Sequence, residues 1–306
     1  MKVISVATWN KRFKYFKKFM SQFDDEFLKE FHYVVNMTED DWKIFPQELK
    51  DEYKDKVEFN ITKINYGSTN KLLPILKYND KHPVMIMDDD CLYNKEYIRD
   101  MFNLNVKDCI IGTYGAIVNP QTSPIMFERT TTSELFKTNP NKKFFKKFMY
   151  EKNYLNKPVK DVIFYGHGTI LYPANLVKFK LEDFESFKNA DDELAFKYSL
   201  EQGIMKYVFD NGKNARSVLG EIGNRNTGLC SPNDVENHSN RLIGVWKLVL
   251  PLCNFTPIVD IVDKKSKYLN SKISRGSTFY EKILQIHEKV IEGLNLKPKL
   301  NGFFED

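Results

Sequence analysis

The first hundred residues alternate short apolar runs with segments of helical character, and this alternation constrains the fold more than any other feature. Four runs rich in β-branched and aromatic residues predict strands, at residues 2–8, 31–37, 57–64 and 83–90. The spacing of apolar residues between them predicts helices, at residues 11–27, 70–79 and 94–103. Strands that alternate with helices are typical of a mostly parallel sheet covered on both faces, so we predict an α/β fold.

Beyond residue 107 the pattern is less regular. It predicts strands at 108–118, 162–176 and 204–209, helices at 189–203 and 277–294, and a polar, basic, helix-prone insertion at 128–161. Asn189 or Asp191 is the expected N-cap of the helix that begins there.

The composition is that of a soluble globular chain. The 306 residues are 42% hydrophobic and 28% charged, enough for one large domain or two small ones. The net charge of +5 is mild, and we expect no nucleic-acid partner. Basic residues cluster at Lys11–Lys18 and Asn141–Phe148, where solvated helix faces are favoured over contact with phosphates or an anionic membrane.

The cysteines and the N-terminus indicate a reducing compartment. The four cysteines form no C-x-x-C pair, which argues against a zinc site, and they suit a cytoplasmic protein. The apolar run at the N-terminus is too short for a signal peptide. We therefore expect a cytoplasmic location, with the basic segments as the place for any peripheral contact with the inner face of a membrane.

Three consecutive carboxylates, Asp88, Asp89 and Asp90, follow the fourth predicted strand directly. Ligands of such sheets bind beyond the carboxyl ends of the strands. Alternate residues on a strand point the same way, so we expect Asp88 and Asp90 to share a direction and Asp89 to point the other way. Two parallel carboxylates suit Mg²⁺ or Mn²⁺. The alternative is a solvated acidic turn at the N-terminus of the next helix.

Two other segments carry candidate chemistry. Asp191 and Asp192 in "NADDELAF" form a second acid pair, for which helix capping is the alternative explanation. Gly166 and Gly168 flank His167 in "YGHGTILYP", where the backbone can approach a ligand closely or simply turn at a strand edge. Lys71 in "GSTNKLLP" is a candidate phosphate contact. His238 is predicted in a polar loop and is expected on the surface, with metal ligation as the less favoured role.

The order of five motifs resembles a group of bacterial, family-2-like glycosyltransferases of the GT-A fold, which carry DDD and ADD motifs. The motifs are "ISVATWNKR", "INYGSTNKLLPIL", "MIMDDDCLYN", "GHGTILYP" and "NADDELAF", between residues 2 and 208. The resemblance implies a GT-A-like (Rossmann-like), mostly parallel central sheet flanked by helices, with a C-terminal extension. It also implies a nucleotide-sugar donor, a glycan or lipid-linked acceptor, and Mn²⁺ or Mg²⁺ as cofactor.

The resemblance also assigns roles to individual residues. It implies donor binding by Thr8, Trp9, Arg12, Lys71, Asp88 and Asp89, metal binding by Asp88 and Asp90, acceptor binding by Gly166, His167 and Gly168, and catalysis by Asp192 and Asp191. Asp192 is expected as the general base and Asp191 as the residue that orients it. Trp9 and Asn10 replace the usual Tyr-Pro, and His167 replaces a small or apolar residue.

The implied function is an inverting, metal-dependent transfer from a UDP-sugar in surface polysaccharide biosynthesis. We expect a GT-A-like catalytic domain at 1–238, with a nucleotide-sugar half at 1–107 and an acceptor half at 108–238, and a mostly helical extension at 239–306. A sugar nucleotidyltransferase is one alternative, but it usually carries a glycine-rich loop after the first strand, and residues 8–16 contain no glycine. A non-catalytic glycan-binding protein of the same fold is the other.

Overall fold

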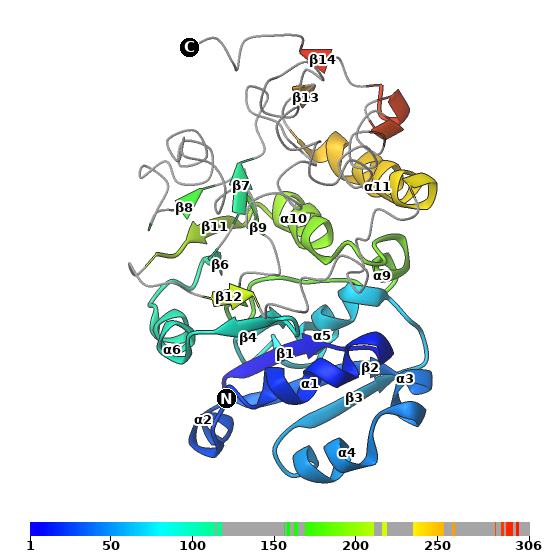
Figure 1. The fold of residues 1–306 in the computed structure, drawn as a ribbon. Helices are drawn as coiled ribbons and strands as arrows, with labels where there is room; N and C mark the ends of the chain where they lie inside the picture. The colour runs from blue at the N-terminus through cyan, green and yellow to red at the C-terminus, as the bar shows by residue number, and fades with distance from the viewer. Residues whose placement is uncertain are drawn as a thin grey trace, which may run out of the picture. The chain divides into compact units, whose positions relative to one another are not determined.

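The computed structural model describes residues 1–113, 115–117, 156, 158–159, 162–164, 169–210, 216–218, 235–253, 259–260, 285, 289–290, 292–295 and 298–299. The chain forms two compact units (Figure 1). The first comprises Met1–Gly115 and Lys152–Leu229, and the second Ala116–Glu151 and Cys230–Asp306.

An eight-stranded sheet organises the first unit, in the order β3-β2-β1-β4-β10-β6-β11-β8. Its strands are β1 (Val3–Ala7), β2 (His32–Thr38), β3 (Glu58–Thr62), β4 (Val84–Asp88), β6 (Cys109–Gly112), β8 (Pro158–Val159), β10 (Ile170–Tyr172) and β11 (Met205–Val208). Neighbours pair in parallel from β3 to β4 and between β6 and β11, while β10 and β8 pair antiparallel with their neighbours. The predicted α/β class with a mostly parallel sheet is confirmed.

Helices and short strands surround this sheet. They are η1 (Asn10–Arg12), α1 (Phe13–Met20), α2 (Asp25–Glu30), α3 (Glu39–Ile44), α4 (Gln47–Tyr53), η2 (Gly67–Leu72), α5 (Leu73–Tyr78), β5 (Cys91–Tyr93), α6 (Lys95–Asn103), β9 (Val162–Phe164), α9 (Asp183–Ser186), α10 (Asp191–Glu201) and β12 (Arg216–Val218). Strand β7 (Gly115–Ile117) begins at the last residue of this stretch of the first unit. Strand β5 pairs antiparallel with β12.

The second unit contains one long described helix. Its elements are α11 (Val235–Val249), η3 (Leu250–Leu252), β13 (Val259–Asp260) and β14 (Pro298–Lys299), with β13 and β14 parallel. Leu242 and Val290 are buried together in a small cluster that includes the partly buried Ile243 and Leu294. Among the described helices of the chain, none is long and apolar enough to cross a membrane.

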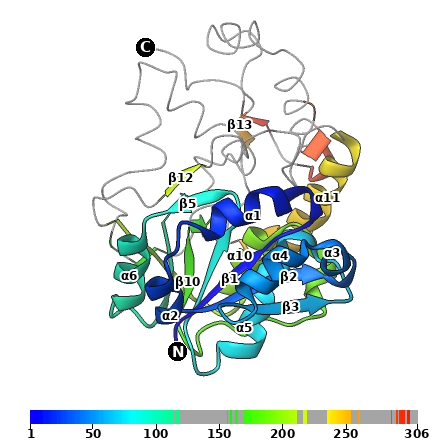
Figure 2. The same ribbon diagram turned by 60° about the horizontal axis from the view of Figure 1, so that its bottom comes forward.

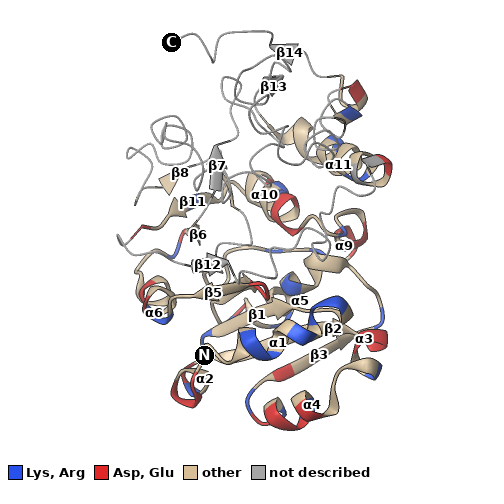
Figure 3. Ribbon diagram, in the orientation of Figure 1, with Lys and Arg blue, Asp and Glu red and all other residues tan. Residues whose placement is uncertain are grey.

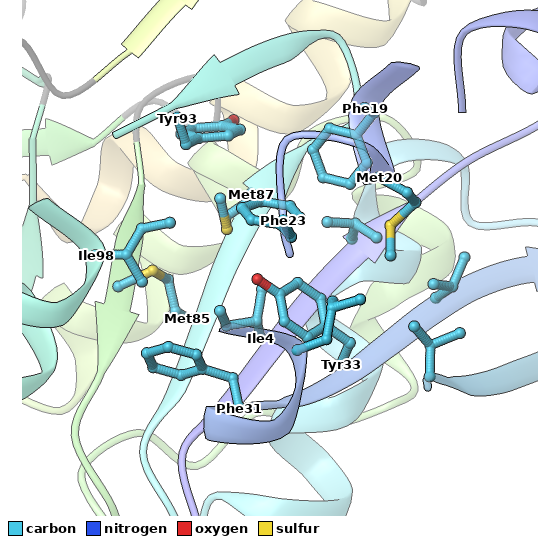
Figure 4. Packing of buried hydrophobic residues seen from close by; sticks show 14 of the residues in the cluster. Ile4, Phe19, Met20, Phe23, Phe31, Tyr33, Met85, Met87, Tyr93 and Ile98 are labelled. Atoms are coloured by element: carbon cyan, nitrogen blue, oxygen red, sulfur yellow. The ribbon is translucent and has the colours of Figure 1, made fainter. Parts of the chain in front are cut away.

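The strands of the large sheet bury side chains on both faces, as their near-continuous apolar sequences require. On one face, Ile4 and Val6 of β1 belong to the main aromatic cluster with Phe19 and Phe23 (Figure 4). On the other face, Ser5 contacts η2. Helix α1 and helix α5 accordingly lie on opposite sides of the sheet (Figure 2).

The predicted helix at 11–27 is wrong in its extent. Helix α1 ends at Met20, and a second helix begins at Asp25, because the side chain of Asp24 accepts a hydrogen bond from the backbone N–H of Phe27 at 2.8 Å and caps α2. The aromatic spacing nevertheless identified the buried side. Its five predicted residues, Phe13, Phe16, Phe19, Met20 and Phe23, are all buried.

Several sequence-based expectations fall outside the described residues. They include almost all of the insertion at 128–161, the basic segment Asn141–Phe148, the glycine pair around His167, and most of the helix at 277–294. The domain boundaries expected from the sequence, at residues 107 and 238, stay predictions.

Replacing Phe16 with alanine tests how far the aromatic cluster stabilises the first unit. Phe16 is fully buried and its ring lies 5.3 Å from Phe45 and 5.8 Å from Tyr53 in edge-on contacts. Phe16→Ala should lower the free energy of unfolding by about 3–5 kcal/mol, through lost burial and the cavity left behind. Ile44, 61% exposed on α3, is the matched control. Urea denaturation that shows equal losses for Phe16→Ala and Ile44→Ala would contradict the packing.

Candidate functional site

The loop after β1 and the Asp triplet after β4 meet at the carboxyl edge of the sheet. Strands β1 and β4 are parallel neighbours, with Ala7 opposite Asp88. Arg12 contacts both acids that follow: one guanidinium nitrogen donates to Asp89, and the other lies 3.1 Å from Asp90. The sequence signals after both strands therefore belong to one site.

Arg12 and Asp89 form a buried ion pair. Burial works against a charge on Arg12, yet the carboxylates of Asp89 and its neighbours raise the pKa of the guanidinium above its ordinary value. For Asp89, burial raises the pKa of the carboxyl, and Arg12 and the Thr8 hydroxyl oppose this shift. Arg12 is thus a permanent cation at the centre of the triplet.

The three acids of the triplet do not share their directions as strand alternation predicts. Strand β4 ends at Asp88, and Asp89 and Asp90 form a turn. The pleat that would align Asp88 with Asp90 therefore stops, and Asp89 and Asp90 share Arg12 instead. The acidic-turn alternative also fails as a helix cap, because Asn94 caps α6 through the N–H groups of its first turn.

Tyr93 holds the backbone of Asp88, which sequence reasoning missed. Its hydroxyl accepts from the Asp88 N–H at 2.9 Å and donates to the Asp88 carbonyl at 3.1 Å. The Tyr93 N–H in turn donates to Gln22 at 2.6 Å. Tyr93 is the tyrosine of "DDDCLY" in the third motif, and its place in that motif is the only signal that the sequence offers for this contact.

Lys71 joins the two acid clusters. Its ammonium lies 2.7 Å from Asp88 Oδ1 and 2.6 Å from Asp191 Oδ2, and the residue is only 3% exposed. Burial disfavours the charge, but the carboxylates around it, Asp191 first, raise the pKa of Lys71 well above its ordinary value. The carboxylate of Asp192 also raises the pKa of Lys71. The structure thus brings the ADD segment to the triplet through one buried cation.

A buried polar chain holds the backbone at Lys71. Ser5 Oγ donates to the Lys71 carbonyl at 2.7 Å, Asn36 donates to Ser5 at 2.9 Å, and Asn60 donates to Asn36 at 2.8 Å. These bonds run across β1, β2 and β3 on the face opposite α1. Sequence reasoning missed this chain, although a serine and an asparagine inside apolar strands are a visible signal because buried polar groups need partners.

Neither predicted cap residue caps helix α10. The N-cap is Ala190, which offers no side-chain hydrogen bond. The Asn189 side chain instead accepts from the Ser68 N–H at 3.0 Å, and Asp191 accepts from the Ser68 hydroxyl. Asp191 and Asp192 are both buried in the first turn of α10, so the N-cap part of the alternative is wrong, while its first-turn part is confirmed.

Gly67 and Asn189 lock the η2 segment onto the start of α10. Both residues have positive φ angles, 63° and 59°. A Cβ on Gly67 would lie 1.6 Å from Asn189 Oδ1, so only glycine fits there. Behind them, the Thr69 hydroxyl donates to the Phe187 carbonyl at 2.7 Å. The contact sets the distance between Lys71 and Asp191.

Some buried polar atoms of the described residues have no hydrogen-bond partner, and several of them belong to residues of the candidate site. Within the described part of the chain, Trp9 Nε1, Arg12 Nε and Tyr172 Oη are buried and have no such partner. Burial raises the pKa of the Tyr172 hydroxyl, and the negative charges of Asp191 and Asp192 raise this pKa further. Buried polar groups are otherwise nearly always paired, so each exception needs an explanation, and a polar ligand would supply partners for these atoms.

The oxygen donors suit a divalent cation that is shared with a ligand. The side chains of Asp88 and Asp90 are each 25% exposed. The described residues contain no group of three or more His, Cys, Asp or Glu side chains placed to hold a metal. Mg²⁺ and similar ions often take one or two carboxylates and complete their shell with water and phosphate oxygens. The residues therefore fit Mn²⁺ or Mg²⁺ that arrives with a phosphate, and do not form a complete protein cage.

The acceptor residues stay untested. Gly166, His167 and Gly168 lie outside the described residues. The predicted loop around His238 is wrong, because this residue belongs to helix α11 in the second unit; its side chain lies outside the described residues.

Comparisons with known proteins find similarity only among solved structures. No protein-family model matches the chain, and no curated protein matches it in sequence. The mannosyltransferase PcManGT from Pyrobaculum calidifontis, in complex with GDP-Man and Mn²⁺, is 9% identical with a TM-score of 0.45, over 94% of this chain and 73% of its own. TarS 1–349 from S. aureus, in complex with UDP-GlcNAc, is 17% identical with a TM-score of 0.42, over 96% and 80%.

A nucleotidyltransferase is similar as well. The putative glucose-1-phosphate thymidylyltransferase from Bacillus anthracis, in complex with a sucrose, is 11% identical with a TM-score of 0.36, over 72% of this chain and 90% of its own. At such identities and TM-scores, these similarities do not establish what this chain binds.

Alanine at Gly67 should disrupt the contact that holds Lys71 beside Asp191. Gly203 is the matched control, because its φ is 65° and nothing lies within 4 Å of an added Cβ. Gly203→Ala should cost about 1–2 kcal/mol of stability, from the positive φ alone. Gly67→Ala carries the same penalty and also forces Asn189 away, so its melting temperature should fall further. Equal melting temperatures for the two variants would show that the contact is unimportant.

Proposed function

We propose that the chain is an inverting, metal-dependent glycosyltransferase that uses a nucleotide sugar, with a UDP-sugar as the expected donor. The observation that carries this proposal is the buried Lys71 ammonium, which joins Asp88 at the end of β4 to Asp191 at the start of α10. The pair lies at the carboxyl edge of a mostly parallel sheet, where such folds bind nucleotides. The acceptor would be a glycan or a lipid-linked glycan of surface polysaccharide biosynthesis.

The donor would bind where the β1 loop meets the Asp triplet. Trp9 offers an aromatic face at the nucleotide end, with the Lys11 ammonium 5.2 Å from its ring centre. Asp88 and Asp90 would share the divalent cation with the diphosphate. The metal supplies charge compensation for the departing nucleoside diphosphate. Arg12 and Lys71 are the cations already in place beside that position.

Asp192 is the proposed general base. Direct displacement requires a base within hydrogen-bond reach of the acceptor hydroxyl, on the face opposite the leaving diphosphate. Asp191 is engaged by Lys71 and Ser68, which suits a residue that orients its neighbour. Asp192 begins the same helix and is buried beside it. A single displacement inverts the anomeric configuration, so an α-linked donor should give a β-linked product.

Two alternative functions differ from this one in the product that they would make: one makes a different product and the other makes none. A sugar nucleotidyltransferase would join a nucleoside triphosphate to a sugar phosphate and release pyrophosphate, and the lack of glycine in residues 8–16 argues against it. A non-catalytic glycan-binding protein would turn over neither substrate. Incubation with a panel of nucleotide sugars and Mn²⁺, followed by detection of free nucleoside diphosphate, separates the glycosyltransferase from the other two. Incubation with nucleoside triphosphates and sugar phosphates, followed by detection of pyrophosphate, separates the nucleotidyltransferase from the binding protein.

Metal dependence is tested at Asp90. Asp90→Asn should abolish turnover of the nucleotide sugar, because one of two carboxylates for the cation is lost, while the circular dichroism spectrum stays unchanged. Asp80→Asn is the control, since Asp80 is an exposed acid whose partner is Lys178. Full activity of the parent protein in EDTA would rule out the metal.

Loss of the base should affect chemistry and spare binding. Asp192→Asn should lower the rate of the chemical step by about 10²–10⁴-fold, the usual contribution of a positioned base, with nearly unchanged donor affinity. Asp191→Asn is the comparison, and it should weaken donor binding as well because Lys71 loses a partner. The proposed role of Asp192 fails if its variant loses donor binding, and single displacement fails if the product retains the donor's configuration.

A further inference from the structure

Lys71 occupies the position between two acid clusters that a divalent cation would also favour. Its ammonium lies 2.7 Å from Asp88 Oδ1 and 2.6 Å from Asp191 Oδ2, and the residue is only 3% exposed to solvent. Asp88 is also one of the two carboxylates proposed for the metal. One carboxylate group therefore faces two cations, one supplied by the chain and one by the ligand.

The surroundings favour a side chain that can change partners while its backbone stays in place. The Lys71 carbonyl is held by Ser5, and the chain of hydrogen bonds continues to Asn36. The backbone at Gly67 is locked against Asn189. The flexible four-carbon stem of lysine extends from this held backbone and places the ammonium in contact with Asp88 and Asp191 at the same time.

We propose that Lys71 is a resident counter-ion that competes with the divalent cation. In the free protein it neutralises Asp88 and Asp191 and keeps the two clusters together. When the metal binds, the ammonium gives up Asp88 and keeps Asp191, which leaves it beside the donor phosphates. This role rests on the proposed function for its metal, but its test needs only Mn²⁺.

The physical reason is electrostatic. Two carboxylates from different segments repel when they are buried together, so a cation between them stabilises the free protein. The same positive charge opposes a second cation a few ångströms away. A purely structural lysine would lower stability when removed, and only a competing lysine would in addition strengthen metal binding.

The decisive measurement is Mn²⁺ binding to the metal-stripped full-length protein without any nucleotide. Lys71→Met removes the charge and keeps the length of the side chain. It should bind Mn²⁺ at least about tenfold more tightly than the parent in a calorimetric or electron paramagnetic titration. In EDTA its melting temperature should be lower than that of the parent. Addition of Mn²⁺ should raise the melting temperature of Lys71→Met by more than it raises that of the parent. Unchanged or weaker Mn²⁺ binding would overturn the proposal.

Two further variants test whether the charge of Lys71 itself is responsible for the effect on Mn²⁺ binding. Lys77→Met is the matched control, because Lys77 is an exposed lysine that interacts with Glu58 and Tyr78, outside the two acid clusters, and should leave Mn²⁺ affinity unchanged. Lys71→Arg keeps the charge and should not bind Mn²⁺ more tightly than the parent. If Lys71→Met does not fold in EDTA, the arginine variant decides: tighter Mn²⁺ binding by Lys71→Arg would contradict competition by charge.

The outcomes separate this role from the proposed reaction. Tighter Mn²⁺ binding by Lys71→Met with no consumption of any nucleotide sugar by the parent would remove the glycosyltransferase and leave the counter-ion. Turnover by the parent with no Mn²⁺ binding by either protein would overturn the counter-ion and leave the reaction.

Discussion

The site depends on one buried ammonium. Lys71 Nζ lies within 2.7 Å of carboxylates from β4 and from α10, two segments that are far apart in the chain. Without that charge, acids from both segments would be buried close together with little compensation, and their repulsion would oppose the packing of α10 against η2. The guanidinium of Arg12 compensates the charges of Asp89 and Asp90 in the same way. The candidate site is therefore an arrangement of acids that the protein's own cations hold in place, and any ligand or metal must enter an existing balance of charge.

The fold supplies the rigid frame for this balance. Parallel pairing of β1 with β4 brings the loop of Arg12 and the Asp triplet to the same edge. On one face of the sheet, aromatic packing anchors α1 directly after Arg12 (Figure 4). On the other, Ser5, Asn36 and Asn60 hold η2 and therefore the backbone of Lys71. Figure 3 shows lysines along α1 and acids at the start of α10, and of these two groups only the acids belong to the buried site.

Sequence reasoning predicted most of the frame and singled out Arg12, Lys71 and the two acid clusters, which the structure brings into contact. It failed where a contact depends on distant segments. Strand positions followed from apolar runs, and helix α1 showed its buried side through aromatic spacing. The helix boundary at Met20 was missed because the cap at Asp24 competes locally with continued helical spacing. Strand alternation misplaced the direction of Asp90, since β4 ends two residues earlier. The expected cap at Asn189 was wrong because that side chain binds the Ser68 backbone across the fold.

The sequence by itself determined the α/β class, the carboxyl edge of β4 as a place for acids, and the residue types that suit phosphate and metal. These follow from periodicity and from the chemistry of side chains, which are local properties. Only the tertiary structure decided which acid meets which cation: Arg12 with Asp89 and Asp90, and Lys71 with Asp88 and Asp191. Pairing of this kind depends on strand order, on the positive φ of Gly67 and Asn189, and on the turn that ends β4. None of these is encoded in the spacing of charged residues along the chain, because ion pairs form between neighbours in space.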